Sequence, residues 1–355
     1  MCDGYLHAIE SQNSSTIMRT ILSLAATLFF LFQSCDQASE INLGSPPPDG
    51  LGKEAREETG TSHIVFRSSD QGKSWQDISD GLPAPVEDSF SGGRRVFFAD
   101  ENGLWITDGK SIFNTKPGIA APYWTRAAFP NERSSIAPGK NGIYAFHHLS
   151  GIFQKTIGTS DWKPVFTEFK DKKVRGVVET ADGSIFISSD KGLFKTEDQG
   201  KTWKNLPAGG LGGKIVEENG VLLTTGPSGI MRSTDGGNNW SWVIREGGVG
   251  IDVTNIKGGF AAIHYSAATK TRRVTASYDG GKTWEPIDAG LPAQLSISSI
   301  VQLGDYLYCG HPDGVFKSAD KGKTWKRVLS AVDRKVYHLT VSGNVLYAIP
   351  RVAGC

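Results

Sequence analysis

One eight-residue pattern occurs five times in this chain of 355 residues and constrains its fold more than any other feature. The pattern is Ser/Thr-x-Asp-x-Gly-x-x-Trp, and its copies begin at Ser68, Thr196, Ser233, Ser277 and Ser318. The last four tryptophans are 37, 44 and 41 residues apart. A fixed period of this length is the signature of a fold built by repeating one supersecondary unit.

The first gap between tryptophans is 128 residues, about three periods, so two further units are expected inside it. Trp124 and Trp162 stand at the expected places. Each follows an apolar strand signal, Gly103-Leu104-Trp105 and Gly151-Ile152-Phe153, but both units lack the Asp-x-Gly turn. The chain therefore contains seven units.

Each unit predicts four short antiparallel strands. In residues 172–206 these are 174–179, 185–188, 193–196 and 203–206, with turn residues between them. The 43 glycines and 9 tryptophans of the chain fit short strands and tight turns better than helices. Four strands in about 40 residues are typical of a propeller blade.

The two ends of the repeat region predict how the ring closes. Residues 335–340 and 345–349 predict first and second strands, whereas 64–67 and 75–78 predict third and fourth strands. Together they make one blade, which leaves no open sheet edge. We therefore predict an all-β fold over 62–350, a seven-bladed β-propeller of four-stranded antiparallel blades, with the ring closed by N- and C-terminal strands and followed by a tail at 351–355.

The repeated motif resembles the Asp-box (BNR) repeat of sialidases, other glycoside hydrolases, sortilin-type receptors and photosystem II assembly-factor propellers. In each copy the aspartate is expected to accept backbone hydrogen bonds within its turn, the glycine to adopt a positive φ, and the tryptophan to pack between sheets. We assign these structural roles to Asp70, Gly72, Trp75, Asp198, Gly200, Trp203, Asp235, Gly237, Trp240, Asp279, Gly281, Trp284, Asp320, Gly322 and Trp325. The spacing lacks the oxygen ligands of a calcium loop, so no metal or other cofactor is predicted.

The N-terminus predicts export. Met18 and Arg19 precede an apolar run from Ile21 to Phe32, which is too short for a bilayer span and fits a signal peptide over 18–34. Ser34-Cys35 resembles a bacterial lipobox, which implies lipidation of Cys35. Residues 35–61 then form a lipidated, polar tether, and 1–17 are an upstream segment ahead of the true start. The resulting expectation is a lipid-anchored protein of the bacterial cell envelope, periplasmic or facing the surface, with the membrane as one partner.

Charge and cysteine content limit the other partners. The net charge is +1, so no basic surface for nucleic acid is expected. Cys309 and Cys355 allow a disulfide in an export compartment, but two unpaired thiols fit the sequence as well.

Ligands of propellers usually meet the face that carries the loops after second and fourth strands. Histidines follow second strands in three different units, so they could surround a common opening. The candidate ligand-binding residues on this face are His147, His264, Arg273, His311 and Asp313.

Two classes of function follow. The resemblance to sialidases implies an arginine pocket, a tyrosine with its glutamate and an acid/base aspartate, but no Arg-Ile-Pro signature precedes Ser68 and no catalytic residue can be assigned. The architecture of one propeller behind a signal peptide is most similar to the assembly-factor type, which implies a scaffold. We therefore expect a non-catalytic binding or scaffold module for a protein or carbohydrate partner, with a sialidase-like glycoside hydrolase as the alternative.

Overall fold

The computed structural model describes residues 63–83, 96–108, 110–130, 134–147, 151–180, 182–206, 214–294, 296–333 and 335–352. The predicted signal peptide, Cys35, the tether and Cys355 lie outside these residues. Among the described residues, no helix is long and apolar enough to cross a membrane.

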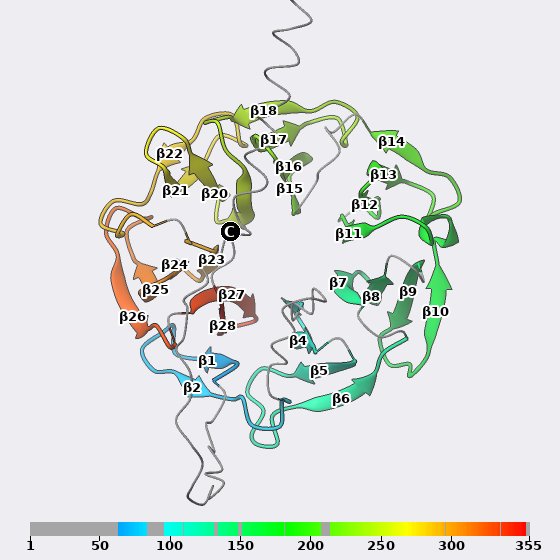
Figure 1. Ribbon diagram of the computed structural model, residues 1–355, viewed down its shortest axis with the longest axis horizontal. Helices are drawn as coiled ribbons and strands as arrows, with labels where there is room; N and C mark the ends of the chain where they lie inside the picture. Colours follow the sequence, from blue (N-terminus) through cyan, green and yellow to red (C-terminus); the bar gives the residue numbers. More distant parts are fainter. Residues whose placement is uncertain are drawn as a thin grey trace, which may run out of the picture. The chain divides into compact units, whose positions relative to one another are not determined.

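The described residues form seven four-stranded antiparallel sheets arranged as the blades of a ring (Figure 1). The first strand of each blade lies nearest the centre and the fourth lies at the outer edge. The predicted seven-bladed propeller is confirmed.

Blade 1 consists of β3 (Phe97–Asp100), β4 (Gly103–Thr107), β5 (Ser111–Thr115) and β6 (Thr125–Ala128). Blade 2 consists of β7 (Ser135–Gly139), β8 (Gly142–His147), β9 (Gly151–Thr156) and β10 (Trp162–Val165). Blade 3 consists of β11 (Val174–Glu179), β12 (Ile185–Ser189), β13 (Gly192–Thr196) and β14 (Lys204–Leu206). Blade 4 consists of β15 (Ile215–Glu218), β16 (Val221–Gly226), β17 (Gly229–Ser233) and β18 (Ser241–Ile244). Blade 5 consists of β19 (Gly250–Ile256), β20 (Gly259–Ser266), β21 (Thr271–Ser277) and β22 (Glu285–Pro286). Blade 6 consists of β23 (Ser299–Leu303), β24 (Tyr306–His311), β25 (Gly314–Ser318) and β26 (Lys326–Ser330). A short 3-10 helix, η1 (Thr167–Phe169), connects blades 2 and 3.

Blade 7 combines the two ends of the propeller. It consists of β27 (Val336–Ser342), β28 (Val345–Arg351), β1 (Phe66–Ser68) and β2 (Gln76–Asp77), in the order β27-β28-β1-β2 from the inside outward. β1 pairs with β28 so that Phe66 faces Ala348 and Ser68 faces Leu346. The predicted closure by terminal strands is therefore confirmed.

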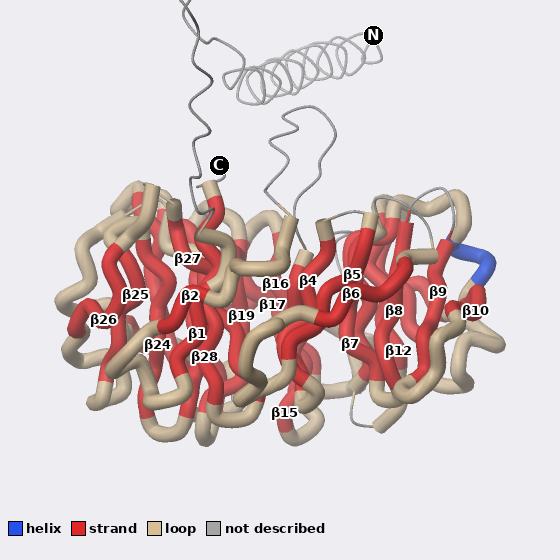
Figure 2. Tube along the Cα trace, turned by 90° about the horizontal axis from the view of Figure 1, so that it is seen from below, coloured by secondary structure: helices blue, strands red, loops and turns tan. Residues whose placement is uncertain are grey.

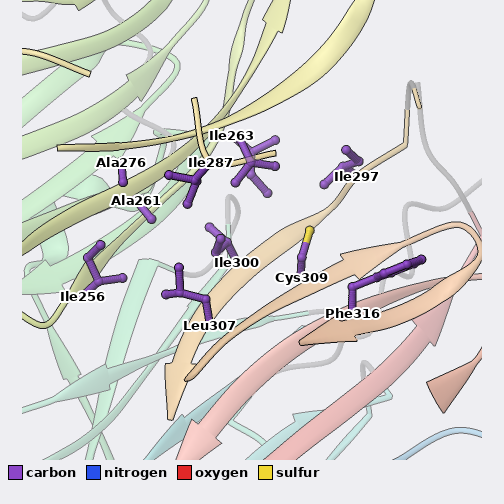
Figure 3. Close-up of a cluster of buried hydrophobic side chains, with 11 residues drawn as sticks. Ile256, Ala261, Ile263, Ala276, Ile287, Ile297, Ile300, Leu307, Cys309 and Phe316 are labelled. Carbon is purple, nitrogen blue, oxygen red and sulfur yellow. The ribbon is translucent and has the colours of Figure 1, made fainter. Parts of the chain in front are cut away.

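The hydrophobic core lies between neighbouring blades rather than within one sheet. In the cluster between blades 5 and 6, Ala261 and Ile263 belong to β20 of blade 5 and Ile287 directly follows β22. Ile300 and Cys309 of blade 6 pack against them (Figure 3). Cys309 is a free thiol and is fully buried there, and burial raises its pKa. Each blade thus needs a neighbour to cover its apolar face, which is why the repeats stack into a ring.

The Asp-x-Gly turns between third and fourth strands contain side-chain hydrogen bonds within the turn. In blade 6, Asp320 accepts bonds from the Ser318 hydroxyl (2.8 Å), the Thr324 N–H (2.9 Å) and the Thr324 hydroxyl (2.6 Å). The N–H of Gly322 donates to Ser318 Oγ (2.8 Å), and its φ is +84°. A Cβ atom at Gly322 would lie 2.5 Å from Cβ of Ile287 in blade 5, so glycine is required for the close approach of the two blades.

Trp124 contacts the preceding blade from blade 1, a unit that lacks the Asp-x-Gly turn. Its Nε1–H donates to the Ile78 carbonyl of the preceding blade at 2.6 Å. Trp325 makes the equivalent bond to the Ile287 carbonyl at 2.8 Å. In these two units the indole N–H therefore connects adjacent blades, whereas Trp240 and Trp284 donate to glycine carbonyls of their own turns.

The propeller has two unlike faces. The hairpin face carries the turns between first and second strands and the Asp-x-Gly turns, whereas the loop face carries the loops after second strands and the connections from each blade to the next. β1 starts beside the end of β28, so the described chain enters at His63 and leaves after Val352 on the loop face (Figure 2).

Candidate functional site

A pocket of about 260 Å³ opens on the loop face of blade 5, where the connection to blade 6 begins. We call it the arginine pocket. Its walls are the β20–β21 hairpin and the connection from β22 to β23, and its lining consists of Thr269, Thr271, Arg272, Arg273, Asp288, Leu291, Pro292, Ala293 and Ile297.

The hairpin that positions the arginines is longer than the sequence suggested. Tyr265 pairs with Arg272 and His264 with Arg273 within the β20–β21 ladder, although His264 and Arg273 were expected in the loop after the second strand. Because successive side chains of a strand point to opposite faces, Arg272 and Arg273 leave β21 on different sides. The Arg272 N–H also donates to the Gln294 carbonyl (3.1 Å), which joins the hairpin to the connection between blades.

Arg273 is already neutralised within the protein. Its Nε donates to Asp288 Oδ2 (2.6 Å) and its Nη2 donates to Oδ1 (3.0 Å), a bidentate ion pair. Asp288 also accepts the Val274 N–H (3.2 Å). The hydrogen bond and charge of Asp288 raise the pKa of Arg273. This pair therefore supports the wall of the pocket, and its carboxylate has few lone pairs left for other chemistry.

Arg272 has no such partner. Its Nη1 donates to the Ile297 carbonyl (2.7 Å), but among the described residues no carboxylate lies within ion-pair distance of its guanidinium group. The side chain is half-buried, and burial lowers its pKa. Two arginines and one aspartate leave the lining with one uncompensated positive charge.

Two of the predicted histidines lie behind this pocket and are buried instead of exposed at an opening. His311 Nδ1 accepts the Asp313 N–H (3.0 Å), which leaves Nε2–H to donate to the carbonyl of Pro292 in the pocket wall (2.8 Å). Its side chain is 0 % exposed. Burial lowers the pKa of His311, so the ring is neutral and fixes the position of Pro292.

His264 is the cross-strand partner of Arg273 in the β20–β21 ladder, and 1 % of its side chain is exposed. Neither ring nitrogen has a hydrogen-bond partner among the described residues, and the nearest carboxylate oxygen, of Glu246, is 4.0 Å away. Burial is the largest influence on the ring and lowers its pKa, although Glu246 acts in the opposite direction. We therefore take His264 as neutral.

The structure brings three of the five candidate residues to one place. Arg273 lines the arginine pocket, His264 pairs with it across the ladder, and His311 holds Pro292. Asp313 is half-exposed beside His311, while His147 ends β8 in blade 2 and lies away from this pocket around the ring. Asp288, which the sequence did not single out, follows Ile287 directly in the connection between blades.

The described pockets hold few groups that could act as catalysts. A second pocket of about 460 Å³ is lined by Gly81, Leu82, Pro83, Asp108, Phe113, Trp124 and Arg126. Each pocket lining contains one carboxylate, and Asp108 accepts the N–H groups of Lys110 and Ser111 in its turn. No group of three or more metal-ligating side chains occurs among the described residues.

Comparison with known proteins supports the fold. No family model and no curated protein matches this sequence. A xyloglucanase of family GH74 from Xanthomonas campestris is similar in structure, with a TM-score of 0.59 and 15% identity over 78% of this chain and 52% of that one. The extracellular domain of a protein described as a one-component system from B. thetaiotaomicron has a TM-score of 0.52 and 10% identity, covering 76% and 42%.

YCF48, solved with a D1 peptide, has a TM-score of 0.47 and 14% identity over 73% of this chain and 94% of its own. The chain spans about half the length of the xyloglucanase and less than half of the sensor domain. These structures include a glycoside hydrolase, an extracellular sensor domain and a peptide complex, and what this chain shares with them is the β-propeller fold.

Proposed function

We propose that this chain is an exported, lipid-anchored propeller that binds a protein partner through its loop face and does not catalyse a reaction. The observation that carries the proposal is Arg272, a half-buried guanidinium group in a pocket whose other charges cancel. A buried charge without a partner costs free energy, and such a cost is offset when a ligand supplies the opposite charge.

The arrangement of acidic groups favours binding over hydrolysis. Glycoside hydrolysis of the usual kind needs two carboxylates on opposite sides of the bond to be cleaved. Asp288 is the only carboxylate in the lining of the arginine pocket, and both of its oxygens accept hydrogen bonds from Arg273. A sialidase-like activity therefore has no support at this site, and a carbohydrate partner is the second choice.

Export and anchoring rest on the sequence of the N-terminus. The chain enters the propeller at His63 on the same face as the arginine pocket, and residues 36–62 separate His63 from Cys35. An extended chain covers about 3.3–3.6 Å per residue, so this tether reaches roughly 90 Å. A lipid on Cys35 would keep the loop face within that distance of the membrane and its proteins.

Rim substitutions test the proposal. Thr269 and Ala293 are exposed on the pocket rim, whereas Asn344 is exposed on the hairpin face. Thr269→Arg and Ala293→Arg should reduce co-purification of one defined envelope protein with the tagged full-length chain, and Asn344→Arg should leave it unchanged. Equal capture by all three variants, or hydrolysis of sialosides or glucans at enzyme-like rates, would contradict the proposal.

A further inference from the structure

We infer that the arginine pocket binds an aliphatic monocarboxylate, supplied either by a free small acid or by the C-terminus of a polypeptide. The inference rests on the proposed function and names the chemical group that the pocket takes. Arg272 is the residue that would hold the carboxylate, and the apolar lining residues Leu291, Pro292, Ala293 and Ile297 would hold the aliphatic part.

The charge of the lining selects a monoanion. Arg273 and Asp288 neutralise one another through two hydrogen bonds, so Arg272 contributes the one net positive charge. A carboxylate carries a single negative charge and accepts two parallel N–H bonds from a guanidinium group. A phosphate, with a charge near −2 at neutral pH, would remain undercompensated in this lining.

The shape and donors of Arg272 are suited to that role. Its Nη1 is held by the Ile297 carbonyl at 2.7 Å, and its backbone N–H is held by the Gln294 carbonyl at 3.1 Å. The first bond fixes the guanidinium group and the second fixes the backbone from which the side chain leaves, before any ligand arrives. A positioned guanidinium group loses less conformational entropy on binding than a mobile one.

The rest of the wall favours an aliphatic group over a sugar. Leu291, Pro292, Ala293 and Ile297 supply an apolar surface without an aromatic ring. The hydroxyl groups of Thr269 and Thr271 bond to one another at 2.9 Å, and Asp288 is occupied by Arg273. Few polar groups therefore remain to pair with the several hydroxyl groups of a sugar acid, which would be left partly unsatisfied.

The size of the pocket sets the size of the ligand. Its volume of about 260 Å³ lies just below the range of roughly 300–1,000 Å³ that holds drug-sized ligands. One branched aliphatic side chain with its carboxylate fits this space, whereas an oligosaccharide would extend beyond it.

Four small probes test the inference on the full-length protein in a neutral maltoside detergent. Isovalerate and acetyl-Ala-Leu carry the carboxylate, and isovaleramide and acetyl-Ala-Leu-amide are their neutral counterparts. Ligand-observed NMR titration should give dissociation constants about tenfold or more lower for the acids than for the amides, because charge-assisted bonds to arginine are the stronger kind. Binding by isovalerate alone would identify a free acid as the source, and binding by acetyl-Ala-Leu would identify a polypeptide terminus.

Matched variants locate the effect. Arg272→Gln should abolish the preference for acids, and Arg272→Lys should restore it in part, because lysine keeps the charge without the planar fork. Arg327→Gln removes one positive charge from an exposed position on β26 and should change nothing. Ala293→Trp should block both acids while leaving Arg272 in place, which guards against a folding defect in the Arg272 variants.

Some results would overturn the inference. These are equal binding of acids and amides, an unchanged preference in Arg272→Gln, or tighter binding of glucuronate or inorganic phosphate than of isovalerate. If the preference for acids is absent while Thr269→Arg still abolishes partner capture, the inference fails and the proposed function stands. If the preference is present while no rim variant changes capture, the carboxylate chemistry stands and the protein-binding role fails.

Discussion

Gly322 offers a quantitative test of how the repeated turns join the blades. Its φ is +84°, and a Cβ atom there would lie 2.5 Å from Ile287 Cβ and 2.6 Å from the Ile287 carbonyl oxygen. Gly343 has a φ of +56° and would place its Cβ in open space, with nothing within 4 Å. Replacing both with alanine therefore separates the backbone cost from the contact with the preceding blade.

The expected magnitudes differ in a defined way. A left-handed conformation costs an L-residue about 1–2 kcal/mol, and this cost applies to both Gly322→Ala and Gly343→Ala. Forcing an extra methyl group into a packed contact adds about 1–3 kcal/mol at Gly322 only. For a domain of this size, 1 kcal/mol shifts the melting temperature by about 2 °C.

We expect thermal unfolding, followed by circular dichroism, to place the melting temperature of Gly322→Ala roughly 2–6 °C below that of Gly343→Ala. The two variants share composition and charge, so the comparison needs no correction for either. Equal shifts in the melting temperature of the two variants would mean that glycine is needed at both positions only for its positive φ. The contact of Gly322 with the preceding blade would then be refuted as a source of stability.

Three further outcomes are expected. Hydrogen bonds from Thr324 and Ser318 lower the pKa of Asp320 to about 2, below the value of this group in the unfolded chain. The stability that Asp320 contributes is therefore present above about pH 4 and is lost as the pH falls from about 4 to 2. Denaturant titrations should show a smaller loss of stability over that pH range in Asp320→Asn than in the unsubstituted protein. Asp288→Asn leaves Arg273 without its carboxylate and should lower the free energy of unfolding by about 1–3 kcal/mol, measured by urea denaturation. Cys35→Ala should move the protein from the membrane to the soluble fraction on centrifugation, and retention at the membrane would contradict the lipid anchor.

Much of the fold was predictable because the repeat is local. The predicted strand over 174–179 coincides with β11, and the predicted pairing of the two ends is found in blade 7. Both rest on short-range patterns: apolar alternation, turn glycines and the spacing of tryptophans. Trp124 was located from the spacing of the repeats although its unit lacks the turn motif, and its indole N–H donates to the Ile78 carbonyl of the preceding blade.

The candidate site was only partly predictable because it depends on where strands end. His264 and Arg273 were expected in a loop, but β20 and β21 continue pairing as far as Ser266 and Thr271. This extension buries His264 and points Arg273 toward Asp288, fifteen residues away. Adjacent Arg272 and Arg273 carry equal charge in the sequence, and only the structure distinguishes the neutralised one from the other.

The arginine pocket on the loop face is the central claim of this account, and photo-cross-linking in the native cell envelope tests it most directly. A photoreactive amino acid at Thr269, on the pocket rim, should yield a covalent adduct with one defined envelope protein, and Arg272→Gln in the same chain should reduce its yield. The same amino acid at Asn344, on the hairpin face, should yield no such adduct. An adduct from Asn344 and none from Thr269 would place the binding surface on the other side of the ring and contradict the claim.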